Sequence, residues 1–317
     1  MLGSVVICAA AWRAPLKKRN IVPVDFQATA SAPRRSFAMW LMVGGSFLIS
    51  FTGLIIRNME AASALHVNFY RAAALFVVIL TFMLVRYGRK TPAHILRVGH
   101  SGLFAGFCLA AAGLCLLQAL TNTTVAATLF ICSAVPFITA ALAWVILRET
   151  PTRSTFMTMA VAVFGLVVMI SGSASSGSVY GNGMALMTAL CFSSFAIVVR
   201  RNRNIEMMPA LLISAVVIMA FTLPVLWSDL AVPAHDLIWC VVLGGFISAL
   251  PNAVFIVASR HLVAAELTLF MLLEFALGPI WVWFFLSEIP GARTILGGFL
   301  VIAAVLLRVM FELSKSR

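Results

Sequence analysis

The chain of 317 residues is 62% hydrophobic and only 10% charged, and it carries a formal net charge of +12. Soluble domains usually contain about 25% charged residues, so a water-soluble core would not absorb this much apolar side chain. The basic residues lie in short clusters between apolar stretches, which argues against a nucleic-acid-binding protein. The composition predicts an all-α integral membrane protein whose second solvent is the lipid bilayer.

Residues 1–36 differ from the rest of the chain. A short apolar run, Val5 to Trp12, precedes a group of basic residues, whereas a secretory signal peptide carries its positive residues before the apolar run. The run is also too short to cross a bilayer, which takes roughly 20 apolar residues. We therefore expect a basic cytoplasmic tail over 1–36, with an over-long start assignment as the alternative.

Apolar stretches punctuated by basic residues predict ten membrane-spanning helices. Two uncharged stretches, 98–147 and 154–199, are each too long for one helix across a bilayer of about 30 Å. A polar run at 121–124 divides the first, and a run rich in Gly and Ser at 171–183 divides the second. The expected spans are approximately 37–56, 62–85, 98–120, 125–147, 156–170, 184–199, 209–227, 237–258, 263–286 and 294–310.

The distribution of Lys and Arg predicts which side of the membrane each loop faces. With the N-terminus inside, all of the 22 basic residues except Arg57, Arg71 and Arg293 fall in cytoplasmic tails and loops. Such a bias sets the orientation of most multi-pass proteins. We therefore expect a protein of the bacterial inner membrane with both termini, including a short tail at 312–317, in the cytoplasm.

Two stretches of the chain are similar to each other. Residues 125–151 and 263–290 both open with Val-Ala-Ala, hold an internal proline and close with Glu-x-Pro, at an offset of 138 residues at the start and 139 at the end. The match indicates a duplicated unit. Because each half, 37–171 and 181–311, holds five expected spans, the second half is inserted upside down. Inverted five-helix repeats are typical of secondary transporters that bind substrate between the halves, near the bilayer midplane.

Several short motifs occur in order along these spans: Phe69-Tyr70-Arg71-Ala72, Val135-Pro136-Phe137 through Leu147-Arg148-Glu149, Gly181-Asn182-Gly183, and Leu273-Glu274-Phe275 through Gly278-Pro279, followed by Phe285-Leu286-Ser287-Glu288. With these motifs the chain, from about Phe37 to Met310, resembles the EamA family of the drug/metabolite transporter superfamily. The resemblance implies a ten-helix carrier, usually an exporter of metabolites, amino acids or drugs. It also implies a central cavity among helices 1, 3, 4, 6, 8 and 9. Arg148, where the family often has glycine, and the long basic tail depart from the family pattern.

Two charged residues lie deep within expected spans. Arg71 is the only basic residue well inside a span, and Glu274 lies about twelve residues into a span of about 24, close to the midplane. Charges inside a bilayer are costly and most often line a pathway or pair with an opposite charge. We expect both to bind substrate, and each is the obvious partner of the other. The alternatives are an Arg71 that snorkels to the interface and a protonated Glu274 bonded to a backbone carbonyl.

Four further residues are candidates for the substrate site. His66 and Asn68 lie on the outward side of Arg71 on the same span, and Asn68, at i−3, falls near the same helix face. Pro136 and Pro279 would each free a backbone carbonyl in mid-span, which is tolerated where the chain lines a cavity or packs on protein. A plain helix kink is the alternative for both prolines.

Other conspicuous residues lie near span ends. Glu149 and Glu288 are each followed closely by a proline, and we expect them to end helices. Trp144, Trp281 and Trp283 could stack on an aromatic substrate, but their positions favour the aromatic belt at the membrane interface.

The sequence offers no sign of cofactor or metal chemistry. Six cysteines and five histidines show no metal-ligand spacing, and nucleotide-binding and catalytic motifs are not recognisable, so we expect no catalytic residue, metal or cofactor. The expected function is export of a small organic solute by alternating access, as a monomer or homodimer. An integral membrane enzyme acting on a lipid-linked group is disfavoured by the short loops. A channel is disfavoured because the isolated polar residues form no charge ring.

We predict that both termini face the cytoplasm. A reporter enzyme that is active only in the periplasm should be inactive when fused after Arg317, because the basic loops hold that side of the protein inside. The same reporter inserted after Ser175, in a loop expected outside, should be active. An active reporter at Arg317 would contradict the orientation.

Overall fold

The computed structural model describes residues 32–59, 61–123, 125–170, 178–227, 229–286 and 292–315. These residues belong to one compact unit, Ala32–Arg317. Every regular element in the described ranges is a helix. The first described helix begins at Ala32, so it takes in the last residues of the tail expected over 1–36; residues 1–31 lie outside the described part of the chain.

The described helices follow one another along the chain with short connections. They are α2 (Ala32–Ile49), α3 (Thr52–Arg57), α4 (Ala64–Tyr87), η1 (Gly88–Lys90), α5 (Thr91–Arg97), α6 (Gly99–Asn122), α7 (Val125–Cys132), α8 (Val135–Leu142), η2 (Ala143–Leu147), α9 (Arg153–Ile170), α10 (Val179–Arg201), α11 (Pro209–Leu226), α12 (Ala234–Val242), η3 (Leu243–Ser248), α13 (Ala249–Ala258), α14 (Ala264–Phe270), α15 (Leu272–Leu286) and α16 (Ala292–Lys315). The segment η1 is a 3₁₀ turn, whereas η2 and η3 are short π-helices that continue α8 and join α12 to α13.

Among the described residues, six helices are long and apolar enough to cross a membrane: Arg35–Ile56, Ala64–Arg97, Gly99–Asn122, Val179–Arg201, Pro209–Leu226 and Ala234–Ala258. Shorter apolar helices cover Val135–Leu147, Arg153–Val168 and Ile295–Phe311. Large apolar side chains such as Phe107, Phe164 and Phe299 are exposed, as expected where lipid rather than water is the solvent. The all-helical membrane class is confirmed, while the number of ten spans and their inverted arrangement stay predictions.

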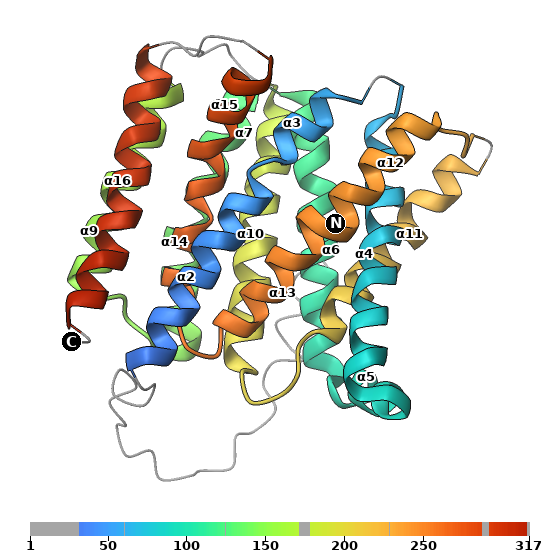
Figure 1. Ribbon diagram of the computed structural model, residues 1–317, viewed down its shortest axis with the longest axis horizontal. Helices are drawn as coiled ribbons and strands as arrows, with labels where there is room; N and C mark the ends of the chain where they lie inside the picture. The colour runs from blue at the N-terminus through green and yellow to red at the C-terminus, as the bar shows by residue number, and fades with distance from the viewer. Residues whose placement is uncertain are drawn as a thin grey trace. The chain divides into compact units, whose positions relative to one another are not determined.

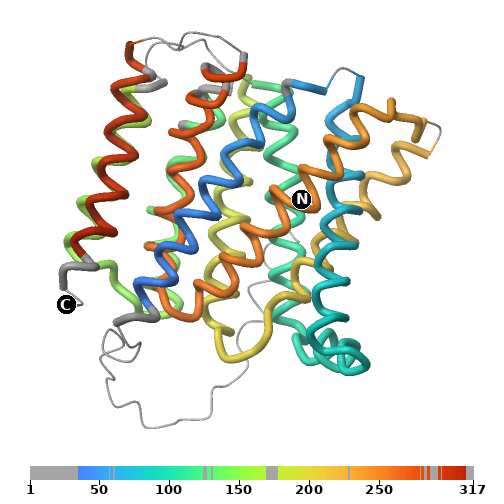
Figure 2. The backbone as a smooth tube through the Cα atoms, in the orientation of Figure 1, coloured from blue at the N-terminus to red at the C-terminus, as the bar shows by residue number. Residues whose placement is uncertain are grey.

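Helices from the two halves of the chain pack against one another (Figures 1 and 2). In the first half, α2 packs against α13 and α15, both from the second half. In the second half, α10 packs along α6 and against α7 and α8. Around them, α9 lies along α16, and α11 lies against α4 and α6. The centre of the bundle is therefore built by helices that belong to both halves.

The tightest helix crossing brings α4 against the π-helix η3. A Cβ atom added to Gly244 would lie only 2.1 Å from the backbone oxygen of Arg71. Only glycine therefore allows the two backbones to approach this closely. Because π-helical turns are found mostly at functional sites, the crossing directs attention to Arg71.

We predict that Gly244→Ala lowers the thermal unfolding temperature of the purified protein, because the added methyl group would separate α4 from η3. Gly44→Ala in α2 is the matched control, since a Cβ there meets nothing within 4 Å. That change should leave stability unaltered or raise it by up to about 1 kcal/mol through helix propensity. Equal changes in the unfolding temperature from Gly244→Ala and Gly44→Ala would contradict the close approach of α4 and η3.

Candidate functional site

Two helices of the bundle are interrupted at corresponding points. In the first half, α7 ends at Cys132 and the next helix, α8, begins at Val135. In the second half, α14 ends at Phe270 and α15 begins at Leu272. The ends of α7 and α14 are 138 residues apart, which is the offset between the two similar stretches of sequence. Interrupted backbone at membrane depth is tolerated only where it is buried in protein or lines a cavity.

The two candidate prolines lie differently with respect to these interruptions. Pro136 is buried in the first turn of α8, where its missing N–H would have no helical partner. Helix α15 continues through Pro279, whose side chain lies outside the described part of the structure. The break of the second span is therefore at Met271 and not at its proline, a correction to the reading from sequence. A proline can stay inside a membrane helix when local adjustments satisfy the freed carbonyl.

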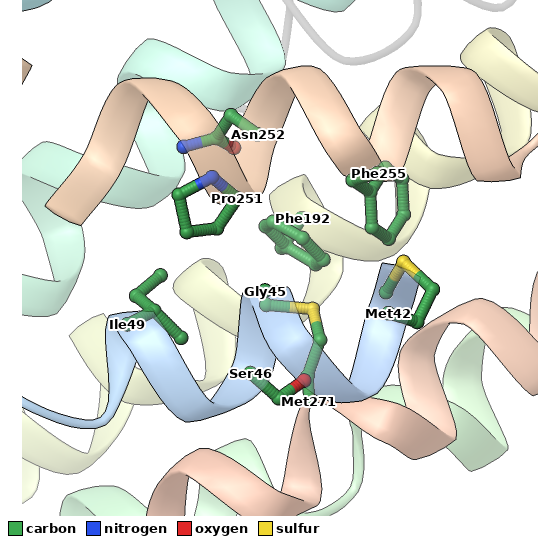
Figure 3. A pocket seen from close by; sticks show the side chains of 9 residues that line it. All are labelled: Met42, Gly45, Ser46, Ile49, Phe192, Pro251, Asn252, Phe255 and Met271. Atoms are coloured by element: carbon green, nitrogen blue, oxygen red, sulfur yellow. The ribbon is translucent and has the colours of Figure 1, made fainter. Parts of the chain in front are cut away.

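A small cavity lies beside the interruption at Met271 (Figure 3). Its other walls come from α2, α10 and α13: Met42, Gly45, Ser46, Ile49, Phe192, Pro251, Asn252 and Phe255. Measured to the centres of water-sized spheres, its volume is about 20 Å³, room for about one water molecule. Figure 3 shows Phe192 between the side chains of α2 and those of α13. The cavity can admit an organic solute only after α2 and α13 move apart.

Glu274 lies one helical turn beyond this interruption, in the first turn of α15. Its backbone N–H donates to the oxygen of Met271 at 3.1 Å, so the restarted helix begins directly beneath the side chain. The positive end of the helix dipole favours a negative charge at this position. The carboxyl group is partly buried. Glu274 therefore stands at the start of the helix that follows the second interruption.

Arg71 lies on α4, at the crossing with η3. Its Nη2 atom donates a hydrogen bond of 3.1 Å to Oδ1 of Asn68, one turn earlier on the same helix. A Cβ atom added to Gly113 on α6 would lie 3.2 Å from the same nitrogen. The guanidinium therefore lies against α6 inside the bundle, which favours partners within the protein over snorkelling to the interface.

Arg71 and Glu274 do not pair with each other. Among the ion pairs of the described residues, neither side chain takes part. The pairing expected from sequence is therefore wrong in this conformation. The reason is position: Arg71 lies on α4, which packs against α6, α11, α12 and η3, whereas Glu274 lies on α15, which packs against α2, α3, α14 and α16.

The two other polar candidates on α4 have different surroundings. Both ring nitrogens of His66 are engaged, one with Oγ of Ser63 and the other with the backbone oxygen of Asp229, each at 2.7 Å. His66 therefore ties the start of α4 to the segment after α11. Asn68 is buried and uses its side-chain oxygen to hold Arg71. Asn68 positions the guanidinium, and His66 is occupied by protein partners.

Sequence reasoning missed the role of Trp281. Its Nε1 atom donates to Oγ of Ser50 at 2.7 Å, and its ring stacks on Phe51 with centroids 4.3 Å apart. The side chain packs between α15 and the end of α2, and the interfacial belt expected for Trp281 stays a prediction. The belt remains compatible with Trp144, which is exposed, while the side chain of Trp283 lies outside the described part of the structure.

Sequence reasoning also missed a buried ion cluster around Glu266. Its Oε1 atom accepts hydrogen bonds from Nη2 of Arg35 and Nη2 of Arg308, each at 2.8 Å, and from Oγ1 of Thr155 at 3.4 Å. The side chains of Glu266 and Arg308 are only 4% and 5% exposed. The cluster joins α2, α9, α14 and α16. Glu266 lies in the first turn of α14, a common position for an exposed glutamate. Nothing in the sequence therefore indicated that this side chain would be buried.

Two further acidic residues pair with arginine near the ends of α10 and α13. Glu149 follows η2 and pairs with Nη2 of Arg200 at 3.0 Å, and Arg200 also donates to the backbone oxygen of Ser259 at 2.7 Å. Glu206 pairs with Arg260 at 3.2 Å. The sequence suggested only that Glu149 ends a helix, but Glu149 also forms an ion pair. Glu288 lies outside the described residues. No group of three or more His, Cys, Asp or Glu side chains within the described ranges could hold a metal ion.

The comparisons with known proteins agree with this picture. Residues 36–171 match the model of the EamA-like transporter family. Two curated relatives are the pseudopaline exporters CntI of Pseudomonas aeruginosa strains UCBPP-PA14 and PAO1, 26% and 25% identical over 272 residues, which cover 83% of this chain and 93% of each relative. A protein of known crystal structure shares the fold, with a TM-score of 0.76 at 14% identity, covering 87% of this chain and 99% of that one.

These findings confirm the family resemblance predicted from the sequence. The family match covers the first expected repeat, whereas the curated relatives and the solved structure extend over most of the chain. A transporter domain, exporters as relatives and a bundle of apolar helices exclude the alternative of an integral membrane enzyme. The chain is a multi-pass membrane transport protein, and its residues 36–171 match the EamA-like transporter family.

Proposed function

We propose that the protein is a secondary transporter that exports a small organic solute across the bacterial inner membrane by alternating access. The observation that carries the proposal is the position of Glu274. The carboxyl group stands in the first turn of a helix that restarts beside a cavity, between helices of both halves of the chain. Interrupted helices that place charged groups near the midplane are how many secondary transporters build their substrate sites.

The coincident interruptions support two inverted five-helix repeats, 37–171 and 181–311. Similar sequences alone indicate duplication, but here the chain also breaks at the same place in both copies, after Cys132 and after Phe270. A pair of inverted units can exchange conformations, and the exchange opens a central site first to one side and then to the other. The distribution of basic residues supports cytoplasmic termini for this arrangement.

The closed ends of the bundle support the same cycle. At one end, Glu149, Glu206 and Glu266 pair with arginines. At the other end, Trp281 bonds Ser50, and Oδ2 of Asp236 accepts from the backbone N–H groups of Ala61 and Ala62, each at 2.8 Å. The cavity at Met271 has room for about one water molecule, which supports a conformation that is closed at both ends. In the proposed cycle, one set of end contacts breaks at a time.

The substrate site is assigned to Glu274 and Arg71, with Asn68 as the residue that orients Arg71. Pro136 and Pro279 shape the two interrupted spans, and His66 closes the outer end of α4. The names of the curated relatives, which are exporters of pseudopaline, support a small metabolite as the exported class. The protein works as a monomer or a homodimer, because one chain supplies both halves of the site.

We expect liposomes that contain the purified protein to show saturable counterflow of at least one solute from a labelled panel of amino acids and related metabolites. Glu274→Gln should reduce this counterflow by about tenfold or more, because glutamine keeps the size of the side chain but loses the ionisable carboxyl group that we propose binds the solute; a hydrogen bond to a charged group is worth about 1.5–3 kcal/mol. Glu206→Gln, the same chemical change in a partly exposed ion pair, should keep most of the activity. Flux that never saturates would point to a channel, and normal counterflow in Glu274→Gln would remove that residue from the site.

Arg71→Ala is expected to lower counterflow while the protein still reaches the membrane, because the guanidinium points into the bundle. Arg71→Lys should restore activity only in part, since lysine keeps the charge but loses the planar fork of donors. Membrane content is measured by immunoblot alongside flux. Wild-type counterflow in Arg71→Ala would dismiss a role for this side chain in transport.

A further inference from the structure

The two ends of the bundle are held closed by different chemistry. The end that carries the start of α2 and the end of α16 holds the Glu266 cluster, in which Glu266 and Arg308 are almost completely buried and Arg35 is 20% exposed (Figure 1). The opposite end holds the Trp281–Ser50 hydrogen bond, the stack on Phe51, and the hydrogen bonds that Asp236 accepts from the backbone N–H groups of Ala61 and Ala62. Opening the first end therefore requires separating oppositely charged side chains, whereas these contacts of the second end contain no arginine.

Several contacts at the charged end join the two halves of the chain. Glu266 of the second half accepts from Arg35 and Thr155 of the first, and Arg200 of the second half pairs with Glu149 of the first. Relative motion of the halves must therefore break these contacts. Removing one partner of a buried charged group leaves the other uncompensated, which is costly. The contacts thus act as a latch only as long as every member is present.

We propose that the Glu266 cluster is the cytoplasmic gate of the transporter, a latch that keeps the central cavity closed to the cytoplasm between transport events. This proposal rests on the proposed function, because a gate has a role only in a transporter. Its test does not, because the test measures access to a cysteine and needs no transported solute. Glu266 supplies the charge at the centre, Arg35 and Arg308 hold it from α2 and α16, and Thr155 bridges it to α9. When the latch opens, α2 and α14 separate, and these two helices reach the cavity through Met42, Ser46 and the segment at Met271.

Glu206 and Arg260 form a weaker contact of the same kind. Their side chains are 17% and 37% exposed, so water screens the attraction between the two charges. The pair therefore stabilises the closed end of the bundle much less than a buried cluster does. Neutralising Glu206 should therefore open the bundle far less than neutralising Glu266. This difference supplies a matched control in which the same glutamate-to-glutamine change is made at the same end of the protein.

The test measures access to Cys132, which is buried at the end of α7, at the first interruption. In a variant that keeps Cys132 as its only cysteine, the membrane-impermeant thiol reagent MTSET is applied to inside-out vesicles and, separately, to right-side-out vesicles. Glu266→Gln should raise the labelling rate about tenfold in inside-out vesicles only, as loss of a charged hydrogen bond predicts. Thr155→Val, a milder change in the same cluster, should raise it in the same direction by less.

The controls make the outcome decisive. Glu206→Gln should leave labelling unchanged, and Ser50→Ala should raise it in right-side-out vesicles. Unchanged labelling in Glu266→Gln, or an equal rise from both sides, would overturn the proposal. If Glu266→Gln does not fold, as judged by size-exclusion chromatography, Thr155→Val decides alone, and unchanged labelling there overturns the proposal. Because the readout is access rather than flux, a failure to find a transported solute would leave this result intact.

Discussion

The structure depends on one constraint: a charge placed among apolar side chains and lipid must find its partners within the protein. Glu149, Glu206 and Glu266 satisfy it with arginines near the helix ends. Glu274 forms no ion pair among the described residues, and its compensation comes from the start of the helix on which it stands. A deep carboxyl group without an arginine is expensive to keep in a structural role, and this is the physical reason for giving it a role in transport.

The same constraint governs the backbone. Chain interruptions inside a membrane protein are stable only where neighbouring groups satisfy the freed donors and acceptors. At the second interruption, Oγ of Ser46 on α2 donates to the backbone oxygen of Phe270 at 2.8 Å, so α2 supports the end of α14 directly. Any outward movement of α2 breaks this bond as well as the contacts of Arg35 with Glu266. The helix that opens the cavity is therefore also the helix that holds the latch, and in the proposed cycle the two events are linked.

The sequence predicted the helical membrane class, the transporter family and the two deep charges, because a charge within an apolar run is visible without any knowledge of packing. It also anticipated that Asn68 and Arg71 share a helix face, since that relation is local. It did not predict the ion cluster, because Glu266 lies 231 residues from Arg35 and only tertiary packing brings them together. The supposed Arg71–Glu274 pair failed for the same reason: two charges at similar depth can face different helices.

The two halves share a broken helix but not its chemistry. At an offset of 138 residues, the position of Glu274 corresponds to Pro136, so one copy places a carboxyl group after the interruption and the other places a buried proline. Two identical copies would place equal charges on both sides of the centre, and like charges in an apolar interior repel strongly. Proline instead starts the new helix at no cost in hydrogen bonding. The repeated break thus supplies a scaffold that can move in two ways, while the single glutamate gives that scaffold one charged site, which lies on the second half and faces the first.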